Sequence, residues 1–102
     1  PAYIVLVADS GDEVVGYLAG ARCEASALRP VRSAELERMF VTSGWRGRGV
    51  GRQLAERFLA WAREHGTAWV TVTAYAANTE ALAFYERLGF ARHTVTLGQQ
   101  LI

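Results

Sequence analysis

The sequence contains no lysine, and all eleven of its basic residues are arginine. A single cysteine, Cys23, excludes an internal disulfide bond, and a reducing cytoplasm is the simplest setting for such a chain. The formal net charge of +1 gives no electrostatic case for binding nucleic acid or an anionic membrane. No apolar run approaches the length of a membrane span, and no signal peptide is visible. These absences predict a cytoplasmic protein that binds neither nucleic acid nor membrane.

The composition is that of one folded domain. Apolar residues make up 51% of the 102 residues and charged residues 21%, which is typical of a globular protein and not of a disordered chain. A domain of this size buries only about two thirds of the surface that its unfolded chain exposes, so we expect modest stability. No repeat, low-complexity segment or linker divides the chain. We therefore expect residues 1–102 to form a single domain.

Hydrophobic patterning predicts strands and helices in alternation. The expected strands are residues 2–8, 13–23, 33–41, 69–75 and 91–97. The expected helices are residues 49–65 and 78–89, each closed by a glycine. The fold class is α/β (α+β), with a mixed, mainly antiparallel sheet flanked by two helices.

Strict alternation in the third strand would divide its side chains between two faces. On one face we expect Glu35, Glu37, Met39 and Val41. On the other we expect Leu36, Arg38 and Phe40. The two glutamates would then lie side by side on the same surface of the sheet.

A run of glycines comes directly before the first helix, where residues 46–51 read Arg-Gly-Arg-Gly-Val-Gly. The first N–H groups of a helix have no partner within it, and the helix dipole adds partial positive charge there. Glycine lets an anion approach this backbone closely. The pattern predicts a phosphate-binding loop, although a turn in which glycine only serves the geometry explains the loop alone equally well.

Two nucleotide-binding fingerprints fail at this loop. A Walker A loop needs a lysine after its last glycine, and the chain has none. The dinucleotide pattern needs glycines at its first, third and sixth positions, and counting from Gly47 reaches Arg52 at the sixth. The segment instead matches Arg-x-x-Gly-x-Gly, with Arg46, Gly49 and Gly51 in the fixed places.

The loop and the second helix together resemble the GNAT superfamily of N-acetyltransferases. Residues 78–90 contain Asn78, an alanine three residues later, Tyr85 four residues after that, and a closing Gly-Phe pair, which is similar to the second motif of that family. Residues 35–41 resemble the strand that precedes its pyrophosphate loop. The resemblance covers the chain from the first hairpin to about Leu97. It implies a GNAT-like acyl-CoA N-acyltransferase fold, with acetyl-CoA as co-substrate and no metal.

The resemblance also implies how the donor is held. Backbone groups of Met39, Phe40 and Val41 would pair with the pantetheine arm, and the Val41 N–H would polarise the thioester carbonyl. The pyrophosphate would be held by backbone N–H groups of Gly47, Arg48, Gly49, Val50, Gly51 and Arg52. The side chains that would add positive charge are those of Arg46, Arg48 and Arg52.

Asn78 and Tyr85 would complete the site from the second helix. In the family pattern, Asn78 contacts the pantetheine and Tyr85 protonates the departing CoA thiolate. The two residues are seven positions apart, which places them on one helix face about 10 Å apart along the axis. Each also has a simpler interpretation, Asn78 as an N-cap and Tyr85 as a core aromatic residue.

An amine acceptor must lose a proton before it can attack, because a lysine-like amine has a pKa of about 10.4. Glu35 is the first candidate base, since it lies eleven residues before Arg46 and matches the strand carboxylate of the histone-acetylating branch. Glu37 is the second candidate. For both, the alternative is a solvated carboxylate paired with an arginine. The branch that acetylates protein N-termini uses a glutamate where this chain has Thr73, and a threonine cannot act as a base. A chain of water molecules to solvent could also accept the proton in place of a side-chain base.

GNAT domains usually begin with a strand and two helices ahead of the first hairpin, and those helices wall the acceptor site. Here the hairpin comes almost at once, which predicts an N-terminally short form with residues 3–7 at a sheet edge. Such an edge favours pairing with another chain, so we expect a homodimer or a truncated form.

The predicted function is acetyl-CoA-dependent N-acetyl transfer to a primary amine, in a small molecule or a peptide, by direct attack through a tetrahedral intermediate. The alternative is a non-catalytic acyl-CoA-binding or interaction module.

Overall fold

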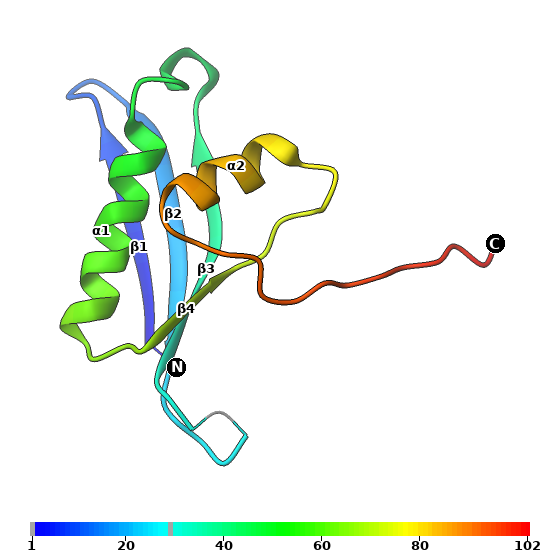
Figure 1. Cartoon of the computed structure of the whole chain (residues 1–102). Helices are drawn as coiled ribbons and strands as arrows, with labels where there is room; N and C mark the ends of the chain where they lie inside the picture. Colours follow the sequence, from blue (N-terminus) through cyan, green and yellow to red (C-terminus); the bar gives the residue numbers. More distant parts are fainter. Residues whose placement is uncertain (1, 29) are drawn as a thin grey trace.

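The computed structural model describes residues 2–28 and 30–102 (Figure 1). Its elements follow one another in the order β1 (Ala2–Asp9), β2 (Val14–Cys23), β3 (Ser33–Val41), η1 (Ser43–Trp45), α1 (Val50–Glu64), β4 (Trp69–Val72) and α2 (Thr79–Arg87). Neither helix in this described part of the chain is long and apolar enough to cross a membrane.

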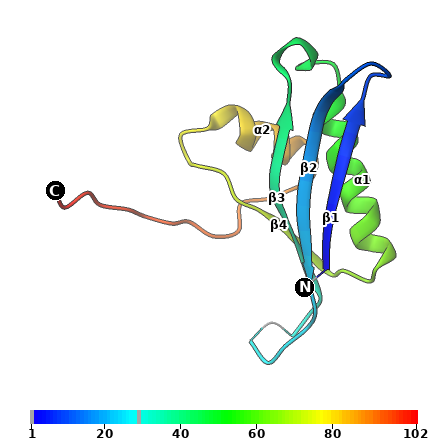
Figure 2. The same ribbon diagram turned by 180° about the vertical axis from the view of Figure 1, so that it is seen from behind.

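The four strands form one sheet in the order β1-β2-β3-β4. The first three pair antiparallel, and β4 pairs parallel to β3. Both helices lie on the same face of the sheet, and the view from behind shows the strands of the other face without a helix over them (Figures 1 and 2). This arrangement confirms the predicted mixed, mainly antiparallel sheet with two helices.

The core lies between the sheet and α1. The helix buries Leu54, Phe58 and Ala62 at helical spacing, as their sequence positions predict. Phe58 is fully buried and lies so close to β2 that a Cβ on Gly20 would come within 2.3 Å of its ring. Only glycine permits this approach, which sets the distance between α1 and the sheet.

Glu37 is an extra residue in β3. Two consecutive residues of β2 pair with Leu36 and Arg38, so Glu37 has no partner and forms a β-bulge. The bulge shifts the alternation, because Leu36 is buried in the core and Met39, three residues later, also packs against it. The prediction that Met39 shares a face with the two glutamates is therefore wrong, since simple alternation assumes a strand without a bulge.

The chain after α2 differs from the sequence-based expectation. Residues 91–102 form no strand in the described structure. Arg92 forms an ion pair with Glu86 and His93 packs against Trp69, and the chain beyond them extends away from the body of the molecule (Figure 1). Val95 and Leu97 have exposed fractions of 79% and 89%. An alternating pattern of apolar residues is not sufficient for a strand, because the backbone of a strand must also form hydrogen bonds with a neighbouring strand. In the same region β4 ends at Val72 and not at Tyr75.

Candidate functional site

The start of α1 has no cap of its own. Its N-cap residue is Gly49, which has a φ of 85° and no side chain to accept a hydrogen bond, and the first helical turn contains no acidic residue. Gly47 also has a positive φ, of 75°. The first backbone hydrogen bond of the helix runs from the N–H of Gln53 to the carbonyl of Gly49, at 3.0 Å.

Six consecutive N–H groups are left open by this geometry. Within residues 2–28 and 30–102, no acceptor is bonded to the N–H of any residue from Gly47 to Arg52. The positive φ of Gly47 and Gly49 turns the chain sharply at the start of α1, and the helix dipole adds its partial positive charge there. The loop can therefore bind an anion such as a phosphate through its backbone.

Arg46 fixes the end of β3 next to this loop. Its Nε donates a hydrogen bond of 2.9 Å to the Val41 carbonyl, and its guanidinium lies over the Phe40 ring at 5.7 Å from the centroid. The side chain predicted to add positive charge to the phosphate site therefore also joins the loop to the strand.

Arg48 and Arg52 have partners within the chain as well. Arg48 lies over the Trp45 ring at 4.4 Å, and Arg52 forms an exposed ion pair with Glu56 at 3.6 Å. Exposed contacts of this kind contribute little to stability, so both guanidinium groups remain available to an anion at the loop. Trp45 was not identified from the sequence, although an aromatic residue three positions before an arginine can indicate a cation–π contact.

Beside the loop, β3 and β4 separate. Their parallel pairing covers Ser33–Leu36 and Trp69–Val72 and then stops, so the outer edge of β3 beyond Leu36 has no strand beside it in the described chain. The N–H of Thr42 points to β2, where it bonds to Val15 at 2.9 Å. Because successive backbone groups of a strand alternate in direction, the N–H of Val41 points to the open edge.

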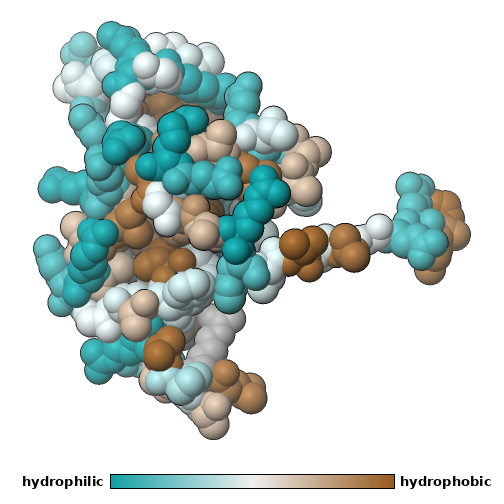
Figure 3. All heavy atoms as spheres, in the orientation of Figure 1, coloured by the Kyte–Doolittle hydropathy of each residue, from teal (hydrophilic) through white to brown (hydrophobic). Residues whose placement is uncertain are grey.

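Gly51 lies where three elements meet. A Cβ at this position would be 3.5 Å from Cζ of Phe84 on α2 and 3.7 Å from Cε of Met39 on β3. Apolar residues are exposed on this face between the two helices (Figure 3).

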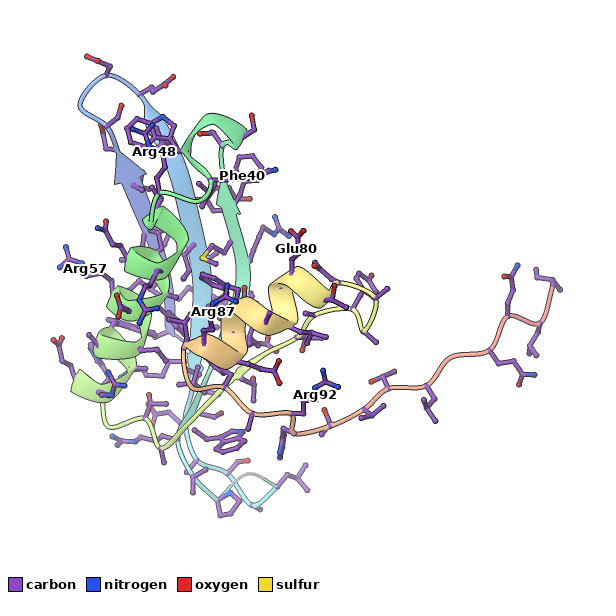
Figure 4. The ribbon with its side chains drawn as sticks, turned by 45° about the horizontal axis from the view of Figure 1, so that its top comes forward. Phe40, Arg48, Arg57, Glu80, Arg87 and Arg92 are labelled. Carbon is purple, nitrogen blue, oxygen red and sulfur yellow. The ribbon has the colours of Figure 1, made fainter. Side chains whose placement is uncertain are left out.

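Arg48 lies at the start of α1, Phe40 at the end of β3, and Glu80 at the start of α2, around the same end of the molecule (Figure 4). Sequence reasoning missed Phe84, whose only signal was its position beside Tyr85.

Asn78 caps α2. Its side-chain oxygen accepts a hydrogen bond of 3.1 Å from the N–H of Ala81, which confirms the simpler of its two interpretations. The amide nitrogen of Asn78 makes no hydrogen bond to the described residues, so it can still donate one to a ligand. The contact between Asn78 and pantetheine stays a prediction.

Tyr85 is half-buried on the inner side of α2. Its ring packs against the core and makes edge contacts with Phe84 and Phe90, at 5.2 and 5.8 Å between centroids. Burial raises the pKa of Tyr85 above its ordinary value of 10.0, because the phenolate would lose hydration there. The hydroxyl therefore keeps its proton at neutral pH and can donate it to a stronger base.

Glu35 and Glu37 lie apart from Tyr85. They line a small hollow with Tyr3 and Cys23, and Glu35 lies on the face of the sheet opposite its neighbour Leu36, which is buried in the core. No ion pair joins either glutamate to an arginine within the described structure, so the expected pairing alternative is not found. Cys23 is half-buried at this hollow.

Comparisons with known proteins agree with this geometry. Residues 1–90 match the sequence model of the acetyltransferase (GNAT) family. An uncharacterized N-acetyltransferase of Methanocaldococcus jannaschii is 30% identical over 95 residues, and a mycothiol acetyltransferase of Corynebacterium glutamicum is 36% identical over 89 residues. An aminoglycoside acetyltransferase from a soil metagenomic sample, solved with sisomicin, superposes with a TM-score of 0.81 at 22% identity and shares the fold.

The chain matches only part of each of these proteins. The alignments cover 90% and 84% of this chain but 41% and 27% of the two curated relatives. The structural match covers 98% of this chain and 66% of the metagenomic enzyme.

Proposed function

Because the chain belongs to the acetyltransferase (GNAT) family, we propose that it transfers an acetyl group from acetyl-CoA to a primary amine. One observation carries this proposal: six consecutive N–H groups, from Gly47 to Arg52, are open at the uncapped start of a helix. They suit the pyrophosphate of CoA, which is a dianion that backbone donors can hold without a lysine.

The rest of CoA extends from this loop along the open edge of β3. Pantetheine pairs with the backbone of Met39, Phe40 and Val41 as a further strand would, and the amide nitrogen of Asn78 donates to it from α2. The arginine side chains at positions 46, 48 and 52 add positive charge around the phosphates.

The transfer begins when the neutral amine attacks the thioester carbonyl carbon. A C–N bond forms, and the carbonyl oxygen becomes an oxyanion that accepts a hydrogen bond from the N–H of Val41. Collapse of this tetrahedral intermediate breaks the C–S bond, and the thiolate takes the proton of Tyr85. The attacking nitrogen loses one proton to Glu35, to Glu37 or through water to solvent, and a proton from solvent restores the Tyr85 hydroxyl, so the products are an amide and the free thiol.

The test is thiol release from acetyl-CoA across a panel of primary amines, with the Tyr85→Phe variant beside the wild type. We expect this variant to lower kcat by at least tenfold and to leave CoA affinity within twofold, because only the proton donor is lost. Tyr75→Phe is the matched control, since Tyr75 is 88% exposed and lies outside the site.

A wild-type protein that binds CoA but releases no thiol with any amine would refute the transfer chemistry. The function would then be that of a non-catalytic acyl-CoA-binding module.

We also propose that two copies associate through β1. This strand pairs with β2 alone among the described strands, and its outward side chains Tyr3, Val5 and Val7 are 70%, 64% and 56% exposed. A hollow of about 500 Å³ lies between β1 and α1, with Leu6 and Leu54 among its lining residues. An antiparallel β1 strand from a second copy would pair this edge and cover the hollow.

Sedimentation equilibrium tests the dimer. Val5→Arg places like charges opposite each other across the two-fold axis, so we expect it to yield monomers. Val31→Arg changes a comparably exposed valine in the β2–β3 loop and should leave the association unchanged. A wild-type protein that is monomeric at every concentration would refute this part of the proposal.

A further inference from the structure

Arg48 differs from the other two arginines at the start of α1 in what its side chain contacts. Arg46 donates a hydrogen bond to a backbone carbonyl, and Arg52 forms an ion pair with Glu56. Arg48 forms neither a side-chain hydrogen bond nor an ion pair in the described part of the chain, and its guanidinium lies over the Trp45 ring. The charge of Arg48 is therefore not neutralised by a neighbouring carboxylate.

The contact with Trp45 restricts the position of this guanidinium without using its hydrogen-bond donors. The cation is 4.4 Å from the centroid of the indole, where the negative face of the ring attracts it. Arginine carries five N–H donors in a fixed planar arrangement, which matches the oxygens of a phosphate group. Arg48 is thus a phosphate-binding side chain whose position is set before a ligand arrives.

The backbone around Trp45 fixes the ring in its turn. The N–H of Trp45 donates a hydrogen bond of 2.9 Å to the carbonyl of Thr42, and the N–H of Thr42 donates one of 2.9 Å to Val15 in β2. The side chain of Trp45 is half-buried. Because η1 is bonded to the sheet and leads directly into the glycine loop, Trp45 and Arg48 have a defined place beside the open N–H groups.

Arg48 lies on the side of the loop away from α2. In Figure 4, Phe40 lies between Arg48 and Glu80, which marks the start of α2. Pantetheine was placed along the open edge of β3, within reach of α2, and it is joined to one phosphate of the pyrophosphate. The nucleoside is joined to the other phosphate and leaves the loop on the opposite side. Arg48 is the arginine that faces this side.

The nucleoside of CoA carries a third phosphate, on the 3′ oxygen of its ribose. This group is a monoester, so it carries a charge of about −1.5 to −2 at neutral pH and has three oxygens that accept hydrogen bonds. The backbone donors of the loop suit the pyrophosphate and leave this third phosphate without a partner. A positioned arginine with open donors is the side chain that such a monoester binds best.

From this arrangement we propose that Arg48, held over Trp45, binds the 3′-phosphate and makes the protein select CoA over 3′-dephospho-CoA. Arg48 is then a specificity residue for the acyl donor, and Trp45 is a positioning residue that acts through it. The proposal rests on the donor site proposed above, in which the pyrophosphate and pantetheine are assigned and the 3′-phosphate is not.

The test compares CoA with 3′-dephospho-CoA, because the two ligands differ only in this phosphate. Isothermal titration of the whole chain at one ionic strength gives both dissociation constants. We expect the wild type to bind CoA about tenfold more tightly, which is typical of one charge-assisted contact. Arg48→Gln should reduce this preference to about twofold and leave the affinity for dephospho-CoA unchanged, because only the contact with the third phosphate is lost.

Two other arginines provide matched controls. Arg52→Gln removes a charge at the same helix start, and it should weaken both ligands by the same factor and keep the preference. Arg63→Gln removes an exposed charge in the last turn of α1 and should change neither affinity. If Arg48 acted on the pyrophosphate, Arg48→Gln would behave as Arg52→Gln does.

Variants of Trp45 separate position from charge. Trp45→Leu keeps Arg48 but removes the aromatic ring, so we expect it to lower the preference for CoA by about threefold or more. Trp45→Phe keeps a ring and should retain most of the preference. Unchanged binding of dephospho-CoA shows that each variant is folded. A preference that is the same in Trp45→Leu as in the wild type would overturn the positioning role of Trp45.

The two proposals fail in different ways. Equal binding of the two ligands by the wild type, or a full preference in Arg48→Gln, would overturn the role of Arg48 and leave the transferase function standing. A preference for CoA without thiol release from any amine would overturn the transferase function and leave the role of Arg48 standing. A wild type that binds neither ligand would overturn both.

Discussion

The two helices of this protein begin in opposite ways. At the start of α2, the Asn78 side chain accepts a hydrogen bond from the helix backbone, and Glu80 adds a negative charge in the first turn. At the start of α1, Gly49 offers no side chain, and the first turn has no acidic residue. Both starts carry the same partial positive charge. In α2 the chain itself satisfies that charge, whereas in α1 it is left for an anion from outside.

The contrast also shows why one glycine-rich segment carries so much functional information. A helix start that needs only stability takes a capping residue such as asparagine, which contributes about 1 kcal/mol over alanine. The start of α1 has glycine in that place, which costs only about a few tenths of a kcal/mol relative to asparagine but leaves the backbone donors open. A ligand that bonds to these donors should stabilise the fold, so CoA should stabilise the protein as well as react on it.

The strongest test of this contrast is Gly49→Glu. A side chain at this left-handed position is strained, and its carboxylate would repel a pyrophosphate. For the wild type, CoA at a hundred times its dissociation constant should raise the free energy of unfolding by about 2.7 kcal/mol. We expect the variant to lose this gain almost completely, as measured by thermal unfolding with and without CoA.

Gly89→Glu provides the matched control for that experiment. Gly89 has a φ of 100° and open space around it, so a glutamate at this position introduces the same backbone strain and the same charge at the end of α2. It should unfold earlier than the wild type and yet keep the full shift with CoA. A Gly49→Glu protein that still responds to CoA would contradict the phosphate-binding role of the loop.

A smaller effect is expected at the capped helix. Asn78→Ala should lower the free energy of unfolding by about 1 kcal/mol, because the N–H of Ala81 loses its acceptor. Asn78→Asp keeps the cap but loses the amide donor. If Asn78 also contacts pantetheine, the aspartate variant should keep its stability in urea unfolding and lose CoA affinity several-fold. Unchanged affinity in the aspartate variant would leave Asn78 with a capping role only.

The smallest expected effect concerns the charge around the open helix start. Glu56→Gln releases Arg52 from its ion pair, at a cost to stability of about 0.5 kcal/mol or less. The freed cation should improve CoA affinity by about twofold at low salt, and added salt should remove the gain. Isothermal titration at two ionic strengths measures both. Weaker CoA binding at low salt would show that Arg52 does not act on the phosphates.

Local sequence signals predicted the parts of the fold that depend on neighbours in the chain. The glycine loop, the buried face of α1 and the Asn78 cap each follow from residues within a few positions of one another. They are also the parts that point to CoA, because a helix start makes an anion site from its own backbone.

The features that the sequence did not predict depend on pairing between distant segments. The bulge at Glu37 exists only in register with β2, and it moved Met39 to the core side of the sheet. Residues 91–97 alternate as a strand does, but no described strand pairs with them. The hollow at Glu35 brings together β1, β2 and β3, and no local pattern reports such a meeting.

The short pairing of β3 with β4 also affects how long the protein survives in solution. Beyond Leu36, this edge of β3 pairs with no strand of the described chain, and another extended polypeptide could join it. A bound pantetheine arm would occupy that edge and so act as a shield against aggregation. Shelf life and yield during purification should therefore improve when CoA is present in the buffer, even where no acetyl group is transferred.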